Sequence, residues 1–312
     1  MTGRTNGPSV VALGGGHGLS VTLRAVSRYA GDVTAVVSGA DDGGSSGRLR
    51  AWWSGPAPGD LRRCLLALAG DSADQQMWAK VLDYRFGEGE LAGHSLGNLV
   101  VLGLAETLGD LGRAADELGR LLGVSARVLP ACAEAVQLRA EALGPGGSVF
   151  EVAGQAKIAH CEGKLARVWV EPPDPEVPAV VLEAIRSADQ VVLGPGSLYT
   201  SVLAVCSVPA VRQALAERKG GRIYVCNLDY QIPETAGLDA QAHLDALAAH
   251  GVAFDTIVCD PATPVGAPAA RALPQEPAAQ VAVVRADLSS PDGRSHDPAL
   301  LSKVLAGLAL SP

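Results

Sequence analysis

The chain has 312 residues, of which 48% are hydrophobic and 19% charged, enough to bury a sizeable core. Its formal net charge of −8, with scattered Lys and Arg, excludes the basic surface that a nucleic-acid-binding protein needs. No apolar stretch reaches the roughly 18 residues of a membrane span, and the polar first residues lack a secretion signal, so we expect a cytoplasmic protein with small-molecule or protein partners.

Short apolar runs rich in β-branched residues alternate with longer helical patterns along the chain. Such runs are typical of parallel strands that are buried on both faces and joined by right-handed helical crossovers. The predicted strands of the main sheet are 9–13, 33–38, 190–194, 222–226, 255–259 and 280–284. They predict an α/β fold with a Rossmann-like, doubly wound, mostly parallel sheet.

The segment from about 59 to 125 has a helical pattern, and we expect it to form a helical subdomain over one edge of the sheet. Further short strands are predicted at 126–130, 135–142 and 165–172, followed by a stiff proline-rich connection at 171–178. A second proline-rich stretch, 260–277, is predicted to be a surface loop. We interpret 1–312 as one domain with this helical extension.

Six cysteines are widely spaced in the sequence, at positions Cys64, Cys132, Cys161, Cys206, Cys226 and Cys259. Their spacing fits neither a zinc knuckle nor a redox C-x-x-C pair. We expect most of them to be small buried apolar residues.

A glycine-rich turn joins the first predicted strand to a helix, and it contains Gly14, Gly15, Gly16, His17 and Gly18. In an open parallel sheet the ligand binds beyond the carboxyl ends of the strands, where the strand order reverses. The free N–H groups and the dipole of a helix start favour an anion there. The dinucleotide fingerprint G-x-G-x-x-G is not met, because its last position is Leu19 or Val21. The turn therefore indicates either a phosphate-binding loop or a bare tight turn.

The second predicted strand is followed by a polar loop with two adjacent carboxylates, Asp41 and Asp42. They could contact a ribose, hold Mg²⁺ that bridges phosphates, or lie in a solvated turn. Ser45 belongs to the same loop. The guanidinium of Arg48 is a candidate phosphate partner, because its geometry matches phosphate oxygens.

Two later strands are also followed by polar groups. The turn after 190–194 predicts a second anion-binding loop, with the candidates Gly194, Gly196, Ser197, Tyr199 and Thr200. The strand 222–226 is followed by Asn227, Gln231 and Glu234, and the last of these is either a ligand contact or part of a helix cap. Two anion-binding turns that face one crevice suit a nucleotide diphosphate.

Two histidines stand beside glycines at predicted helix starts. His17 lies inside the first glycine turn, and His94 opens a helical pattern with Asn98 one turn later. Each is either a ligand contact or a structural residue. The remaining four histidines have no such context, and no hydrolase elbow, zinc-protease motif or P-loop occurs.

Six stretches, in this order, resemble motifs of the gluconeogenesis factor family (YvcK-type, UPF0052), a branch of the CofD-like proteins: LGGGHGLSVTLRAV, ADDGGSSGRLR, PGDLRRCLLALAG, YRFGEGELAGHSLGNLVV, VLGPGSLYTSVL and CNLDYQIPET. The resemblance spans residues 10 to 250 and implies a Rossmann-like core with a helical extension. It also implies that the candidate residues above line a nucleotide site, with Asp41 and Asp42 as ligands of Mg²⁺. Pro233 replaces a glycine of the family pattern, and the segment after residue 259 departs from it.

The resemblance implies a regulatory protein without established catalysis. Its ligand would be a nucleotide or nucleotide sugar, UDP-N-acetylglucosamine or NAD-like, and its role would be in cell shape and in growth on gluconeogenic carbon. Some members are phosphorylated by a Ser/Thr kinase, so a kinase or another protein is an expected partner, as is a second copy of the chain.

The alternative is a Mg²⁺-dependent transferase of the CofD type, which moves a phospholactyl or phosphoryl group from a nucleotide-diphosphate donor. An NAD-dependent oxidoreductase fits less well, because no general acid–base pair is evident. If the first turn cradles a diphosphate, Gly15→Val is expected to block the ligand without disturbing the core.

Overall fold

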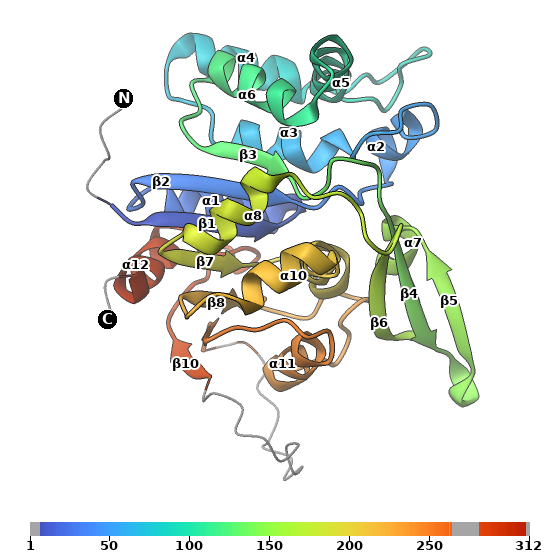
Figure 1. Ribbon diagram of the computed structural model, residues 1–312, viewed down its shortest axis with the longest axis vertical. Helices are drawn as coiled ribbons and strands as arrows, with labels where there is room; N and C mark the ends of the chain where they lie inside the picture. The colour runs from blue at the N-terminus through green and yellow to red at the C-terminus, as the bar shows by residue number, and fades with distance from the viewer. Residues whose placement is uncertain (1–6, 262, 264–280, 310–312) are drawn as a thin grey trace.

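The computed structural model describes residues 7–261, 263 and 281–309. Its central strands are β1 (Ser9–Gly14), β2 (Asp32–Val37), β3 (Arg127–Pro130), β7 (Gln190–Leu193), β8 (Arg222–Val225), β9 (Thr256–Cys259) and β10 (Ala282–Arg285). They form one seven-stranded sheet in the order β10-β9-β8-β7-β1-β2-β3, and every neighbouring pair is parallel (Figure 1). The predicted doubly wound α/β fold is therefore confirmed.

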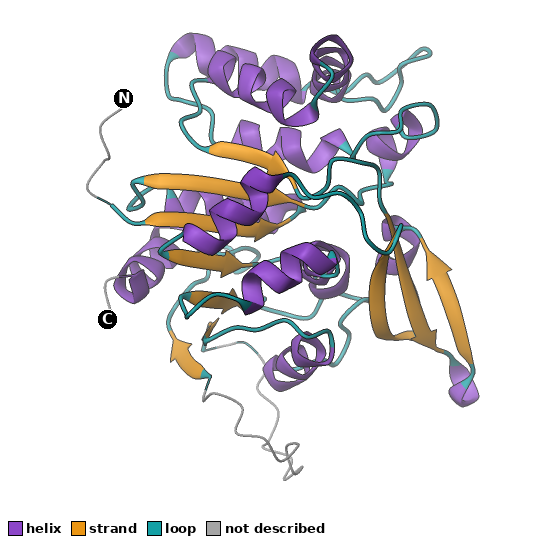
Figure 2. Ribbon diagram, in the orientation of Figure 1, coloured by secondary structure: helices purple, strands orange, loops and turns teal. Residues whose placement is uncertain are grey.

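Helices cover both faces of this sheet (Figure 2). They include α1 (Gly16–Val26), α8 (Ala179–Ser187), α10 (Pro209–Ala216), α11 (Ala240–Ala249) and α12 (Pro298–Ala309). Successive side chains of a strand point to opposite faces. Val11 and Leu13 of β1 pack in a core with α8, α10 and α11, whereas Val10 and Ala12 pack in a second core with α1 and α12. The unbroken apolar runs of the sequence follow from this burial on both sides.

Four further helices lie together beyond the edge strand β3 (Figure 1). They are α3 (Pro58–Ala67), α4 (Ala73–Asp83), α5 (Leu96–Leu108) and α6 (Leu111–Leu122), and they follow the short helix α2 (Gly44–Leu49). Polar caps define two of their starts: Ser72 forms a reciprocal capping box with Gln75, and the Asp110 carboxylate accepts the N–H of Arg113. Helix α3 joins this group to the sheet, because it also packs against α1.

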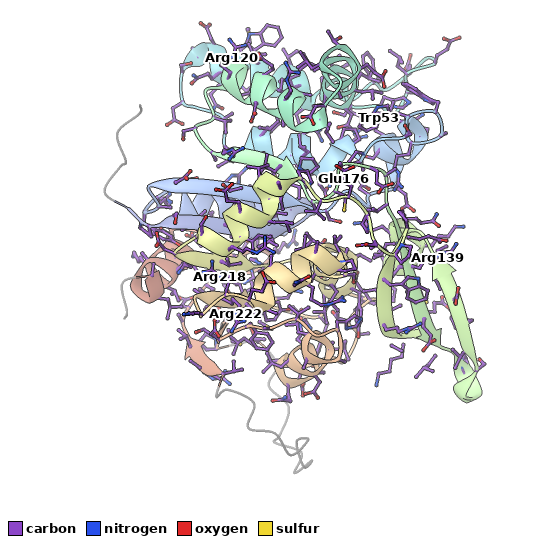
Figure 3. All side chains as sticks on the ribbon, viewed as in Figure 1. Trp53, Arg120, Arg139, Glu176, Arg218 and Arg222 are labelled. Carbon is purple, nitrogen blue, oxygen red and sulfur yellow. The ribbon has the colours of Figure 1, made fainter. Side chains whose placement is uncertain are left out.

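A second, three-stranded antiparallel sheet lies beyond the carboxyl ends of the main strands (Figure 1). Its strands are β4 (Gln137–Leu143), β5 (Val149–Ala153) and β6 (Lys164–Glu171), and α7 (Gln155–Ala159) connects β5 to β6. On β4, Arg139, labelled in Figure 3, pairs with Glu151 and Glu171 across the neighbouring strands. The sequence predicted β4 and β6, but not β5 and not their separation from the main sheet.

The other sequence predictions concern the cysteines, the second proline-rich stretch and membrane-spanning segments. All six cysteines are buried and free, as predicted. Residues 262 and 264–277 of the proline-rich stretch 260–277 lie outside the described part of the chain. In the described part, no single helix is long and apolar enough to cross a membrane, although the bent pair Leu198–Cys206 and Pro209–Ala216, at 78°, reaches that length together.

Gly18 in α1 offers a test of how closely the turn after β1 packs against the turn after β7. A Cβ atom at Gly18 would lie 2.0 Å from the carbonyl oxygen of Pro195 and 2.9 Å from the Cα of Gly196. We expect Gly18→Ala to lower the free energy of unfolding by about 2 kcal/mol or more, because both neighbours are backbone and must move. Urea denaturation measures this change.

Gly103→Ala is the matched control, since Gly103 lies inside α5 and a Cβ there would meet nothing within 4 Å. It should raise stability by up to about 1 kcal/mol, because Ala has the higher helix propensity. Equal effects of the two substitutions would contradict the close packing.

Candidate functional site

The strand order reverses between β1 and β7, which is the switch point where doubly wound folds bind ligands. The turns that follow these two strands are in direct contact, through the packing of Gly18 against Pro195. The hydroxyl of Thr22 in α1 donates to the carbonyl of Gly194, with an O···O distance of 2.7 Å. The two glycine-rich turns therefore form one rigid unit.

A crevice of about 380 Å³ opens beside this unit. Five of the predicted residues line it: His17, Gly18, Gly196, Asn227 and Gln231. Other lining residues were missed by the sequence reasoning, among them Tyr230, Arg294 and His296. Arg294 and His296 belong to the stretch DGRSHDPALL. The Arg and His of this stretch could have indicated a ligand site from the sequence. Only the fold, however, brings them next to the first turn.

His296 is buried in the wall of the crevice. Its Nε2 lies 3.1 Å from the carbonyl oxygen of Cys226, at the end of β8. Burial lowers the pKa of His296 to about 4, against smaller opposing effects of the Cys226 carbonyl and of Asp260. The ring is thus neutral at pH 7 and fixes the last segment of the chain against the sheet.

Asp60, at the start of α3, is the carboxylate that holds the first glycine turn. Its side chain is almost fully buried, and its Oδ2 accepts the N–H of Gly16 at 2.8 Å. Its Oδ1 forms an ion pair with Nη1 of Arg63 at 2.6 Å. The chain itself therefore occupies one N–H of the α1 start, and the N–H groups of His17 and Gly18 are left without an intrahelical acceptor.

The expectation that Gly15→Val would block a ligand and leave its surroundings intact is wrong. A Cβ at Gly15 would lie 2.5 Å from Oδ2 of Asp60 and 3.7 Å from Oγ of Ser201. A side chain there would displace the carboxylate that holds Gly16. Gly15 is required by this internal contact, whatever the crevice binds.

Asp41 and Asp42 face different partners. Oδ1 of Asp42 accepts the N–H of Ala156 at 2.8 Å, which ties the loop after β2 to the start of α7. Oδ1 of Asp41 accepts the N–H of Gly43 at 3.0 Å, and its Oδ2 faces Gly59 at the start of α3. The predicted pairing of Asp41 with Asp42 as cation ligands is therefore not favoured by these contacts, whereas the charge of Asp41 acts on the carboxylate of Asp60.

The electrostatics of Asp60 reflect this neighbour. Burial raises the pKa of Asp60, the charge of Asp41 raises it further, and Arg63 with the N–H of Gly16 opposes both effects. The described residues contain no group of three or more His, Cys, Asp or Glu side chains that could hold a metal ion. Mg²⁺ is commonly held by one or two carboxylates together with substrate phosphates, so a pair of this kind fits that cation.

The second predicted anion-binding turn is already filled by Glu234. Its Oε1 accepts the N–H groups of Tyr199 and Thr200 at 2.8 and 3.1 Å, and its Oε2 accepts the Thr200 hydroxyl at 2.7 Å. Burial raises the pKa of Glu234, although these donors and Ser197 oppose the effect. The predicted second anion-binding turn is therefore corrected at Tyr199 and Thr200, because a carboxylate of the chain takes their N–H groups.

The side chains of Tyr199 and Thr200 consequently do not face the crevice. Tyr199 is 4% exposed, and its hydroxyl donates to the carbonyl of Leu165 on β6 at 3.1 Å. The Thr200 carbonyl accepts Nε2 of Gln155 from α7 at 2.9 Å. Both residues join the turn after β7 to the small sheet.

Asn227 holds the same turn from the side of β8. Its Oδ1 accepts the N–H of Gly196 at 3.0 Å, and its Nδ2 donates to the Gly196 carbonyl at 2.9 Å and to Oε1 of Gln231 at 3.2 Å. The amide therefore fixes the backbone of Gly196 at the floor of the crevice and orients Gln231.

Ser45 and His94 form a separate polar group at the start of α5. Oγ of Ser45 lies 3.1 Å from Nδ1 of His94, and Arg48 lies beside Gly93. Partial burial lowers the pKa of His94, and the charges of Arg48 and Arg85 lower it further, so the ring is neutral at pH 7.

Asn98 was predicted to face the ligand, and the structure corrects this. The side chain is buried, and its Oδ1 accepts Nε of Arg62 at 2.9 Å. Asn98 therefore orients an arginine of α3 from within the helical group.

Glu234 allows a test of the filled turn. Glu234→Ala leaves two N–H groups and a hydroxyl without their acceptor, and we expect it to lower the free energy of unfolding by about 3 kcal/mol. Glu234→Gln keeps an oxygen for the N–H groups and should cost about 1 kcal/mol or less. Chemical denaturation at pH 7 compares the two, and equal losses would contradict the assigned role.

The pH dependence provides a second readout of the same group. The pKa of Glu234 is raised above its ordinary 4.5 in the folded protein, so the unfolded chain releases the carboxyl proton at lower pH than the folded chain does. Wild-type stability therefore decreases as the pH rises from 4.5 through the folded-state pKa. Glu234→Gln lacks this component. The stability difference between the wild type and this variant should therefore shrink over the same pH interval, and a constant difference would contradict the shift.

The chain resembles known proteins over most of its length. The family model "2-phospho-L-lactate transferase CofD" matches residues 10–294. A protein of Halalkalibacterium halodurans named "Gluconeogenesis factor" is 41% identical over 254 residues, which are 80% of this chain and 77% of that protein. A Mycobacterium tuberculosis relative, whose name also refers to a gluconeogenesis factor, is 44% identical over 306 residues, 96% of this chain and 90% of its own length.

A solved structure resembles the fold. The crystal structure of a member of the UPF0052 family from Bacillus halodurans has a TM-score of 0.84 and 33% sequence identity to this chain. The match covers 96% of this chain and 99% of that one. The resemblance therefore includes the main sheet, the helical group and the small sheet.

Proposed function

Because the chain belongs to the gluconeogenesis factor (UPF0052) branch of the CofD family, we propose that it binds a nucleotide diphosphate, as carried by a nucleotide sugar, in the crevice beside the switch point. One observation carries the proposal. The crevice adjoins the start of α1, where the N–H groups of His17 and Gly18 have no intrahelical acceptor. These donors and the positive end of the helix dipole favour a phosphate group.

The remaining lining residues suit the rest of such a ligand. Arg294 supplies a guanidinium, which can donate two parallel hydrogen bonds to phosphate. Gln231 and Asn227 present amide groups, and the partly exposed ring of Tyr230 offers a flat surface to a base or a sugar. The volume of about 380 Å³ is at the lower end of small-molecule sites, so part of the ligand would extend out of the crevice.

Asp41 and Asp60 would hold Mg²⁺, since they are neighbouring carboxylates close to the first turn. The cation would add to the positive charge that Arg63 already supplies to Asp60, and it would draw the phosphates of the ligand towards it. Asp60 also retains the N–H of Gly16, so the same residue would align the turn and the cation. Asp42 is left out of this proposal because its carboxylate ties the loop after β2 to α7.

We propose a role as a nucleotide-sensing protein in preference to catalysis. A transferase of the CofD type is the second candidate, and the acidic pair beside the first turn favours it. Calorimetric titration with UDP-N-acetylglucosamine, NAD and GDP, each with and without Mg²⁺, followed by mass analysis of the recovered ligand, separates the two. Tight binding of an intact nucleotide sugar supports the sensor, an altered ligand supports the transferase, and no binding contradicts both.

The cation site is tested by two isosteric substitutions. Asp41→Asn should remove most of the increase in nucleotide affinity that Mg²⁺ produces, because one of the two carboxylates is lost. Asp42→Asn keeps an oxygen for the N–H of Ala156 and should retain that increase. Titrations in Mg²⁺ and in EDTA measure the difference. A loss of the Mg²⁺ effect in the Asp42 variant alone would overturn the assignment.

A further inference from the structure

A second cavity, of about 550 Å³, lies among α1, α3 and α4, and His17 lines both this cavity and the crevice. Its wall carries five basic side chains, Arg24, Arg62, Arg63, Lys80 and Arg85. Asp83 is the single acidic residue that lines it within the described part of the chain. This concentration of positive charge stands out, because the whole chain has 33 acidic and 25 basic residues.

Two of the five cations are compensated by carboxylates. Arg62 pairs with Asp83, and Arg63 pairs with Asp60. Among residues 7–261, 263 and 281–309, the other three form no ion pair. Arg85 donates to the carbonyl of Gly93, which carries no net charge. The cavity therefore holds a surplus of positive charge that a ligand could neutralise.

Arg62 gives the cavity a preformed element. Its side chain is almost fully buried, and Asn98 and Asp83 together fix the orientation of its guanidinium. A side chain already held in place loses little conformational entropy when it binds a ligand. Arg24, Lys80 and Arg85 are exposed and can adjust around an anion.

We propose that this cavity is a second anion-binding site, separate from the crevice, that takes a small phosphorylated molecule with at least two negative charges. Arginine guanidinium groups match phosphate oxygens in pairs, and lysine supplies a compact charge. The volume lies within the range of small-molecule sites, and the charge is confined to a single cavity, unlike the extended basic surface of a nucleic-acid binder. The proposal does not require a nucleotide in the crevice.

The probe is inorganic pyrophosphate, titrated into the full chain by calorimetry in EDTA at constant chloride. We expect the double variant Lys80→Gln, Arg85→Gln to bind it about tenfold more weakly or worse, because two charged donors are lost. The matched control is Lys164→Gln, Lys303→Gln, which removes the same charge at exposed positions of β6 and α12. It should bind within about twofold of the wild type, since distant surface charges are screened.

Arg294→Gln distinguishes the two cavities, because Arg294 lines the crevice and does not line the second cavity. A separate site is supported if Arg294→Gln retains its affinity for pyrophosphate while the Lys80, Arg85 double variant loses it. Four results would overturn the proposal. They are a loss of pyrophosphate affinity in Arg294→Gln alone, equal losses in Arg294→Gln and the Lys80, Arg85 double variant, an equal loss in the charge-matched control, and no binding of pyrophosphate to the wild type. A failure of UDP-N-acetylglucosamine to bind would contradict the proposed function alone, so the two proposals fail separately.

Discussion

The turns at the switch point depend on two buried carboxylates that accept backbone N–H groups from distant parts of the chain. Asp60 accepts the N–H of Gly16, and Glu234 accepts those of Tyr199 and Thr200. A buried carboxylate is costly unless it is hydrogen-bonded or paired, and both have several donors. Burial still raises both pKa values, so the compensation is incomplete. In return, the two turns are held in shape before any ligand is present.

These carboxylates also change how the glycine-rich turns are interpreted. A helix start with free N–H groups binds anions, but the anion can come from the protein itself. Here Glu234 takes two N–H groups and a hydroxyl in the second turn, whereas Asp60 takes one N–H group in the first. The asymmetry leaves the start of α1, beside His17, as the place where an external phosphate can still be accommodated.

The sequence predicted local features well, because they depend on patterns within a few residues. Six main strands, the helical character of the segment around 59–125 and the burial of the cysteines follow from runs of apolar and β-branched residues. Strand β5 was not predicted, because Val149 and Phe150 are exposed and its sequence pattern therefore lacks a buried apolar face. The separation of the small sheet could not be predicted either, since pairing between strands is not a local property.

The roles of single site residues were harder to predict for the same reason. Asp60 is 44 positions from Gly16, and Glu234 is 35 positions from Tyr199. Short-range capping rules cannot find such contacts, because they consider only the residues next to a helix start. A buried tyrosine and a ligand-binding tyrosine also look alike in sequence. Residue type and spacing thus located the switch point, but the division between ligand contacts and supporting residues required the fold.

His17 is the point at which the two cavities meet. Its side chain is exposed, lines both cavities and makes no hydrogen bond to the rest of the described chain. Under the two proposals above, an anion on one side that orients the imidazole would change what the ring offers to the other side. Coupling of this kind is reciprocal, since the free energy by which one ligand alters the binding of the second must act equally in the other direction. A protein that senses a nucleotide in the crevice would thereby also respond to the phosphorylated molecules around it.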